Sequence, residues 1–240
     1  MSGIAAEIHP CVIDPNVAPQ NHALSQRLTR LGLCRTHTAH GEALYAPGFE
    51  PDDADVKRRV ADYWTPFHES VLTELLRLRE LHANVFMLVS HASSWLSPFR
   101  SQLAAADCNF STSNGASCDK RLIAAVTQAA RSFYRSWVVN GKSAGGFAAH
   151  HYGKPESGIH VVEVEIAGNW RREIELARNE GKGIDTHEAA MLNLLDSAER
   201  ALATFDRDYS SMRHTSSGRS DKALAMSRDT CLSTARLRRS

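Results

Sequence analysis

The stretch HVVEVEI, from His160 to Ile166, decides the fold class that this sequence predicts. Its apolar residues are β-branched, which favours a buried strand, and Glu163 and Glu165 alternate with them. Side chains two residues apart on a strand point to the same face, so we expect both carboxylates on one side of a sheet. There they either face water at an edge or line a pocket, in which one of them could act as a general acid or base.

Two further short apolar runs precede this stretch and complete the expected sheet. They are VFMLVS, residues 85–90, and SWVV, residues 136–139. The second run ends at Asn140-Gly141, a strong turn signal. Both runs are too short for helices and are rich in residues that favour strands, so we expect each of them to be a strand.

Long stretches with apolar residues at steps of three and four predict helices. These cover about residues 52–82, about residues 119–134, and a segment that begins at Asp185. Pro66 should kink or divide the first helix. Strands that alternate with long helices predict an α/β fold, in which a mostly parallel or mixed sheet is flanked by helices.

Composition and charge exclude several classes of protein. The 240 residues are 42% hydrophobic and 23% charged, which is typical of a globular protein, and the formal net charge of +1 argues against a nucleic-acid partner. We expect no membrane association, because no apolar run is long enough to span a bilayer. The first residues lack the pattern of a secretion signal, and the five cysteines form no C-x-x-C pair. We therefore expect a cytoplasmic protein.

The last part of the chain differs from the rest in composition. Residues 207–240 carry eight Lys or Arg against three Asp, together with eight Ser and one aromatic residue. Such a segment cannot bury enough apolar area to offset its chain entropy, so we expect a basic, Ser-rich tail without fixed structure. Residues 1–206 are long enough to form a single α/β domain.

The 12 histidines raise the expectation of a metal or acid–base site without selecting its residues. In α/β sheets such sites gather at the carboxyl ends of strands, and His91 directly follows residues 85–90. A polar cap on a buried strand is the alternative for His91. His150 and His151 are adjacent and would face opposite sides on a strand. The sequence has no H-E-x-x-H, G-x-S-x-G or phosphate-loop motif.

Two blocks of sequence resemble the N-formylglutamate amidohydrolase family. The first is NFSTSNGASCD, residues 109–119, and the second is NGKSAGGFAAHHYGKPESGIHVVEVEI, residues 140–166. Upstream, CVIDPNVAP, RTHTAHGEALYAPG and YWTPFH are similar to further segments of the family. The resemblance covers about residues 9–173, and the order and spacing of the motifs agree along it.

The resemblance implies a fold similar to the zinc-carboxypeptidase-like (phosphorylase/hydrolase-like) class. It implies zinc-dependent hydrolysis of N-formyl-L-glutamate to formate and L-glutamate, a step of histidine degradation, with zinc as cofactor and a small N-formyl amino acid as substrate. His91 matches a metal ligand of the family, and Glu165 matches its general base. The residues that match substrate-binding positions are Asn140, Gly145, Gly146 and His150.

The sequence departs from the family pattern where the remaining metal ligands are expected. The family's opening Pro-His-(Ser/Val)-Gly segment and a downstream acidic segment have no counterpart, so we expect a member shortened at its amino terminus. Val17 and His150 stand where the family has arginines, and Glu163 stands where it has glutamine. Because catalytic zinc takes several protein ligands, the alternative to a hydrolase is a non-catalytic remnant that keeps the scaffold and a ligand pocket without holding catalytic zinc. The shortened sheet would expose an edge, through which we expect self-association.

Overall fold

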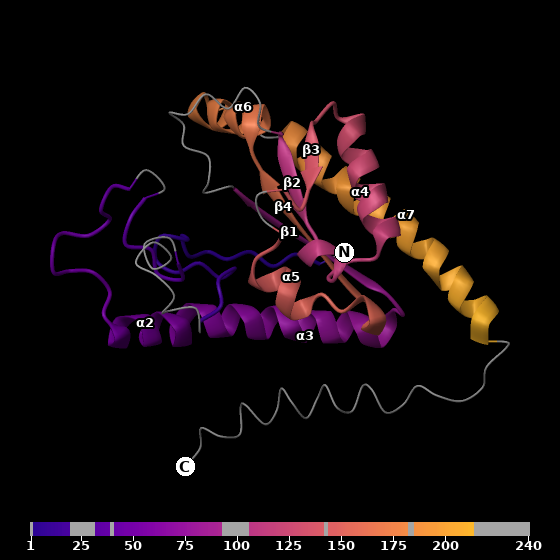
Figure 1. Cartoon of the computed structure of the whole chain (residues 1–240), viewed down its shortest axis with the longest axis horizontal. Coiled ribbons are helices and arrows are strands. Elements are labelled where there is room, and N and C mark those ends of the chain that lie inside the picture. Colours follow the sequence, from indigo (N-terminus) through magenta and orange to yellow (C-terminus); the bar gives the residue numbers. More distant parts are fainter. Residues whose placement is uncertain are drawn as a thin grey trace, which may run out of the picture. The chain divides into compact units, whose positions relative to one another are not determined.

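The computed structural model describes residues 2–19, 32–38, 41–92, 106–141, 144–181 and 185–213 (Figure 1). The chain divides into two units, Met1–Ala203 and Thr204–Ser240, and the first of them contains the sheet. The last helix, α7 (Asp185–Arg213), continues into the segment expected as a tail, so residues 207–213 are helical instead of irregular. Residues 214–240 of that expected tail lie outside the described residues.

A four-stranded sheet organises the first unit, and its strands lie in the order β1-β4-β2-β3. The strands are β1 (Val85–Ala92), β2 (Cys108–Ser111), β3 (Trp137–Val139) and β4 (Ile159–Ile166). β1 is parallel to β4 and β3 is parallel to β2, whereas β2 and β4 are antiparallel. This mixed sheet confirms the predicted α/β class. β2 was not predicted, because its four residues are too few to show a pattern.

The three predicted helices are present, although the first is divided, and two further helices, α5 (Phe147–Tyr152) and α6 (Gly168–Asn179), were not predicted. Residues 52–82 form α2 (Asp53–Arg59), a π-helical turn (Val60–Trp64) and α3 (Thr65–Leu81). Pro66 lies in the first turn of α3, so the hydrogen-bond pattern changes where the proline was expected to interrupt it. The other helices are α4 (Lys120–Ser132), α5, α6 and α7. Within the described ranges, no helix combines the length and the apolar character that a membrane span requires.

Two of these helices begin at aspartates that cap them, whereas α5 does not. Asp52 accepts the N–H of Asp55 at 2.7 Å, and Asp119 accepts the N–H of Arg121 at 2.8 Å. Gly146 occupies the N-cap position of α5 and has no side chain to accept a hydrogen bond. The first N–H groups of α5 therefore need an acceptor from another part of the chain.

Side chains of β4 alternate between the two faces of the sheet. Val161, Glu163 and Glu165 point to the face covered by α3 and α5, where Val161 packs with apolar residues of both helices. Val162 and Val164 point to the opposite face and are fully buried, which stabilises the fold by about 1.5–3 kcal/mol for each side chain. The alternation therefore places both glutamates on one face, as predicted. Because β4 is an inner strand of the described sheet, neither glutamate lies at its edge.

Gly153 follows α5 at a point where the backbone passes close to Ser117. A Cβ atom at Gly153 would lie 2.3 Å from the Cβ of Ser117 and 2.6 Å from the carbonyl oxygen of Ala149. Ser117 is held in place, because its hydroxyl donates to the carbonyl of Val161 at 2.8 Å. We expect Gly153→Ala to lower the free energy of unfolding by about 3 kcal/mol in urea denaturation. Gly3→Ala, whose Cβ meets no atom within 4 Å, is the control, and equal stability of the two variants would contradict this prediction.

Residues 12–17, which we call the strap, are tied to the long helical segment through their carbonyl oxygens. Three side chains donate to them: Arg59 Nη1 to Val12 at 2.8 Å, Trp64 Nε1 to Val17 at 3.0 Å and His68 Nε2 to Pro15 at 2.8 Å. The N–H of Phe147, the first residue of α5, donates to the carbonyl of Asn16 at 2.9 Å. The strap therefore connects the α2–α3 segment to the start of α5 through irregular backbone.

His68 is buried, and its proton positions follow from its partners. A carbonyl oxygen only accepts, so Nε2 carries the proton that it donates to Pro15. Nδ1 then accepts from the hydroxyl of Tyr152 at 2.6 Å. Burial is the main reason why the pKa of His68 is lowered from 6.5 to about 4. The folded protein therefore holds this ring in its neutral form at neutral pH.

This low pKa makes stability depend on pH in a defined direction. Between pH 6.5 and about pH 4, the unfolded chain binds a proton at His68 that the folded chain does not. The contribution of His68 to the free energy of unfolding is therefore complete above this pH window and is lost as the pH falls through it. We expect the free energy of unfolding to drop by about 2 kcal/mol more between pH 7 and pH 5 in the wild type than in His68→Gln. Urea titrations at both pH values measure this, and parallel profiles would refute it.

Candidate functional site

Three polar residues lie in register across the neighbouring strands β1, β4 and β2. Glu165 of β4 is in register with His91 of β1 on one side and with Asn109 of β2 on the other. Register partners point to the same face, which here is the face covered by α5. Because β1 and β4 are parallel, His91 and Glu165 both lie near the carboxyl ends of their strands. The structure thus brings together the expected metal ligand and the expected general base.

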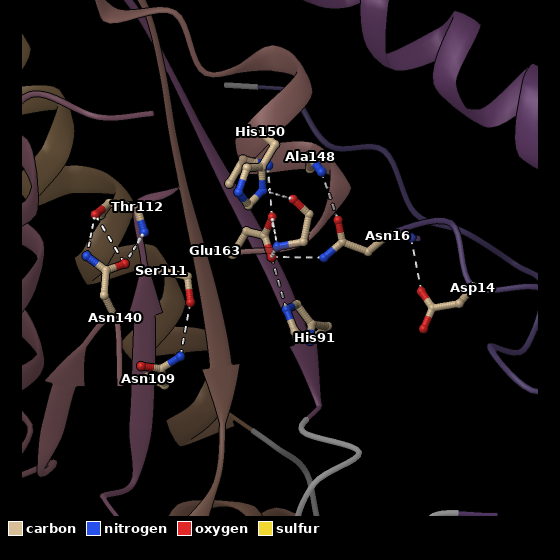
Figure 2. A network of polar contacts seen from close by, with 12 residues as sticks. Asp14, Asn16, His91, Asn109, Ser111, Thr112, Asn140, Ala148, His150 and Glu163 are labelled. Atoms are coloured by element: carbon tan, nitrogen blue, oxygen red, sulfur yellow. Dashed lines mark hydrogen bonds and ion pairs between the residues drawn. The ribbon is translucent and has the colours of Figure 1, made fainter. Parts of the chain in front are cut away.

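Glu163 lies two residues before Glu165 on β4 and points to the same face. It is held by donors from three parts of the chain (Figure 2). Its Oε1 accepts from the N–H groups of Gly146 at 3.0 Å and of Ala149 at 2.8 Å. Its Oε2 accepts from Nδ2 of Asn16 at 2.9 Å and faces Nε2 of His91 at 3.5 Å. The side chain is only 3% exposed. Glu163 thus supplies the acceptor that the start of α5 lacks.

The charges of Glu163 and His91 stabilise each other. Burial by itself raises the pKa of Glu163, but hydrogen bonds from His91, Ala149, Asn16 and Gly146 outweigh this effect and lower it. For His91, partial burial lowers the pKa, but the hydrogen bond and charge of Glu163 and the charge of Glu165 raise it above its ordinary value. The arrangement therefore favours an ionised Glu163 beside a protonated imidazole.

Glu165 differs from Glu163, because the described residues offer it no hydrogen-bond donor. Its side chain is buried, with 8% of the residue exposed. Its charge is one of the causes that raise the pKa of His91, so the carboxylate lies close to that ring. A carboxylate that is shielded from bulk water and is not held by donors can accept a proton from a bound water molecule.

His150 and His151 lie on α5, so the opposite orientation that a strand would give these adjacent residues does not apply. The glycines at positions 146 and 153 enclose a short helical run, and adjacent residues of a helix point about 100° apart instead of to opposite faces. Nδ1 of His150 donates to the carbonyl of Gly146 at 2.7 Å, and the ring itself is exposed. His151 stacks on Phe147, with ring centroids 4.5 Å apart.

The expected substrate-binding residues do not form one group. Gly146 and His150 lie in and beside the first turn of α5, and Gly145 precedes them with a φ of 141°, which favours glycine. Asn140 binds elsewhere: its Oδ1 accepts from the N–H of Thr112 at 2.8 Å, and its Nδ2 donates to the hydroxyl of Thr112 at 2.9 Å (Figure 2). The amide of Asn140 is therefore engaged with the turn after β2, and its contact with a substrate stays a prediction.

Two asparagines that no sequence pattern singled out complete the site. Asn16 lies on the strap and donates to Glu163, and its Oδ1 accepts from the N–H of Ala148 at 2.9 Å. Oδ1 of Asn109 accepts from the N–H of Gly141 at 3.0 Å. Both residues lie in segments that carry the family resemblance, which was the one signal available. Neither belongs to a periodic run or a chemical motif, because their roles depend on backbone groups far away in sequence.

The described side chains do not make up a zinc site. His91 lies beside two carboxylates, but Glu163 is already occupied by amide donors. Among the described residues, no group of three or more His, Cys, Asp or Glu could hold a metal ion. Catalytic zinc takes most of its ligands from the protein. The residues present therefore do not fit the zinc that the family resemblance implies.

Comparison with known proteins begins with the family model. Residues 1–170 match the model of N-formylglutamate amidohydrolase. Two curated relatives named N-formylglutamate deformylase, from Pseudomonas aeruginosa and Pseudomonas putida, are 33% and 34% identical to this chain over 169 residues. The matches cover 69% of this chain and 62% of each relative, so the chain spans less than two thirds of the length of these proteins.

Two solved structures share the fold. N-formylglutamate amidohydrolase from Ralstonia eutropha matches with a TM-score of 0.61 at 17% identity, over 83% of this chain and 75% of that one. A gene product of Agrobacterium tumefaciens matches with a TM-score of 0.54 at 18% identity, over 81% of this chain and 68% of that one. The fold defines an α/β protein whose candidate site lies at the carboxyl ends of two adjacent parallel strands. Given the match over residues 1–170, the chain belongs to the N-formylglutamate amidohydrolase family.

Proposed function

We propose that this chain hydrolyses N-formyl-L-glutamate to formate and L-glutamate. One observation carries the proposal: His91 and Glu165 are paired at the ends of adjacent parallel strands, in a chain whose curated relatives are named N-formylglutamate deformylase. These relatives extend beyond the matched region, so the proposal rests on the part of the site that this chain contains.

In the proposed reaction Glu165 acts as the general base. It accepts a proton from a water molecule as the water oxygen attacks the formyl carbon and a tetrahedral intermediate forms. The same carboxyl group then returns the proton to the nitrogen of the leaving glutamate as the C–N bond breaks, which releases formate and L-glutamate. His91, the register neighbour of Glu165, can supply positive charge while the formyl oxygen becomes negative. No step in this scheme depends on zinc.

The first turn of α5 is our candidate for the surface that binds the glutamate part of the substrate, together with Asn140. Gly145 and Gly146 bring backbone close to the site, and His150 presents an exposed ring beside them. An imidazole donates one hydrogen bond to a carboxylate through a free nitrogen, whereas an arginine donates two in parallel. We therefore expect this chain to hold a substrate carboxylate less firmly than a relative with arginine at the position of His150.

A formate-release assay on the purified chain tests the proposal, with zinc content measured on the same sample. Turnover of N-formyl-L-glutamate by the wild type, lost in His91→Ala, would support it. Zinc bound by the wild type and lost in that variant would support the expected ligand role of His91. No formate release, from protein incubated either with or without added zinc, would overturn the proposed activity.

A non-catalytic binding protein is the second candidate. The small set of metal-ligand side chains among the described residues favours it. It predicts that N-formyl-L-glutamate binds to the chain, as calorimetry measures, while no formate is released. The assay above therefore separates the two candidates.

Self-association through an edge of the sheet is a further part of the proposal. β3 forms one edge of the described sheet, and its residues Trp137 and Val138 are 39% and 38% exposed. An exposed apolar edge favours pairing with a second copy, which light scattering measures.

A cytoplasmic location is supported by the free thiols of the described cysteines, which are Cys11, Cys34, Cys108 and Cys118.

A further inference from the structure

Asn16 of the strap lies between the first turn of α5 and the pair of His91 and Glu165, which we call the strand-end pair. We propose that Asn16 is a positioning residue, which fixes the first turn of α5 relative to His91. This inference rests on the proposed function, because it concerns the substrate-binding turn and the strand-end pair of that same site.

Asn16 uses both halves of its side-chain amide. Nδ2 donates to Oε2 of Glu163 at 2.9 Å, and Oδ1 accepts from the N–H of Ala148 at 2.9 Å (Figure 2). The backbone of Asn16 is engaged as well, since its N–H donates to Asp14 at 3.0 Å and its carbonyl accepts from Phe147 at 2.9 Å. The side chain therefore has one orientation that satisfies all of its partners.

The amide also packs directly against the backbone of the turn that it holds. A Cβ atom at Gly146 would lie 2.4 Å from Nδ2 of Asn16 and 2.9 Å from its carbonyl oxygen. Only a residue without a side chain allows this approach. A displacement of Asn16 therefore displaces Gly146, which our proposed function places at the substrate.

The same amide reaches His91 through a single atom. Oε2 of Glu163, which accepts from Asn16, also faces Nε2 of His91 at 3.5 Å. The strap presents Asn16 from a backbone that Trp64 and His68 hold on either side of it. Asn16 thus contacts the substrate-binding turn directly, and it is linked to His91 of the strand-end pair through one carboxylate oxygen. In such an arrangement a misplacement of about 1 Å costs up to about 10²-fold in rate.

Two substitutions separate the two connections. Asn16→Ala removes both, whereas Asn16→Asp keeps an acceptor for the N–H of Ala148 and loses the donor to Glu163. The kinetics are measured well below the melting temperature of the variant. We expect Asn16→Ala to lower kcat/KM about 10-fold to 100-fold, and part of this loss should appear as a raised KM. Asn16→Asp is expected to affect mainly kcat, because the turn keeps its hydrogen bond. Asn179→Asp, at the exposed end of α6, is the control of equal charge change and should keep wild-type kinetics.

Side-chain ¹H–¹⁵N spectra report on His91 independently of turnover. The signals of His91 are identified by their loss in His91→Gln, and we expect them to shift in both Asn16 variants but not in Asn179→Asp. Wild-type kinetics and wild-type His91 signals in folded Asn16→Ala would overturn the positioning role, and so would unshifted His91 signals in Asn16→Asp. If the wild type releases no formate, the proposed hydrolysis fails, while shifted His91 signals in the Asn16 variants still support positioning.

Discussion

Glu165→Gln is expected to lower the rate of formate release by about 10²-fold to 10⁴-fold, because glutamine cannot accept the proton of the attacking water. The substitution keeps the size of the side chain. Since the described residues give Glu165 no hydrogen-bond donor, no known native bond is lost, and we expect little change in the melting temperature. Substrate binding should also persist, so calorimetry with N-formyl-L-glutamate and the formate assay together isolate the chemical step.

Glu175→Gln provides a matched control for this prediction. Glu175 lies on α6, is 55% exposed and pairs only with Arg171 in the described structure. Removing its charge therefore changes the net charge by the same amount without touching the site. If Glu165→Gln keeps more than about one tenth of the wild-type rate, Glu165 is not the general base.

Glu163→Ala is expected to lower the free energy of unfolding by about 3–5 kcal/mol. It removes the acceptor of the N–H groups of Gly146 and Ala149 and of the amide of Asn16, and these donors stay buried without a partner. It also leaves His91 without the carboxylate that it faces. Urea denaturation followed by circular dichroism measures the loss.

Glu163→Gln separates the charge of this residue from its hydrogen bonds. The glutamine oxygen can keep both N–H donors of α5, while its amide group opposes that of Asn16, so we expect a smaller loss of about 1–2 kcal/mol. If Glu163→Ala does not fold, the glutamine variant carries the test. A loss below about 1 kcal/mol in Glu163→Ala would show that Glu163 does not anchor the start of α5.

The parts of the fold that could be predicted are those in which one segment carries its own pattern. The period of two in residues 160–166 and the period of three to four in residues 52–82 follow from which face each element buries. By contrast, α5 carries no cap of its own and is stabilised at its start by Glu163 and Asn16. A helix whose start depends on distant partners leaves no local signal, which is why no helix was predicted at residues 147–152.

The candidate site could be predicted in the same partial way. The alternating pattern of residues 160–166 predicted that Glu163 and Glu165 lie on one face of the sheet. The position of His91 at the end of a predicted strand indicated that it lies near them, and both predictions agree with the register of the sheet. Which of the two carboxylates is held and which is free depends on the N–H groups of α5 and on the amide of Asn16. No spacing within residues 160–166 contains that information, so only the assembled structure distinguishes an anchor from a proton acceptor.

The two side-chain bonds of Asn16 join positions that are 147 and 132 residues apart along the chain. Contacts of such long sequence separation close large loops and are slow to form. Glu163 cannot be buried at low cost before the strap and α5 have both arrived with their donors. We therefore expect the strand-end pair to be assembled at the end of the folding reaction, so a chain still emerging from the ribosome cannot complete this site until β4 has been synthesised.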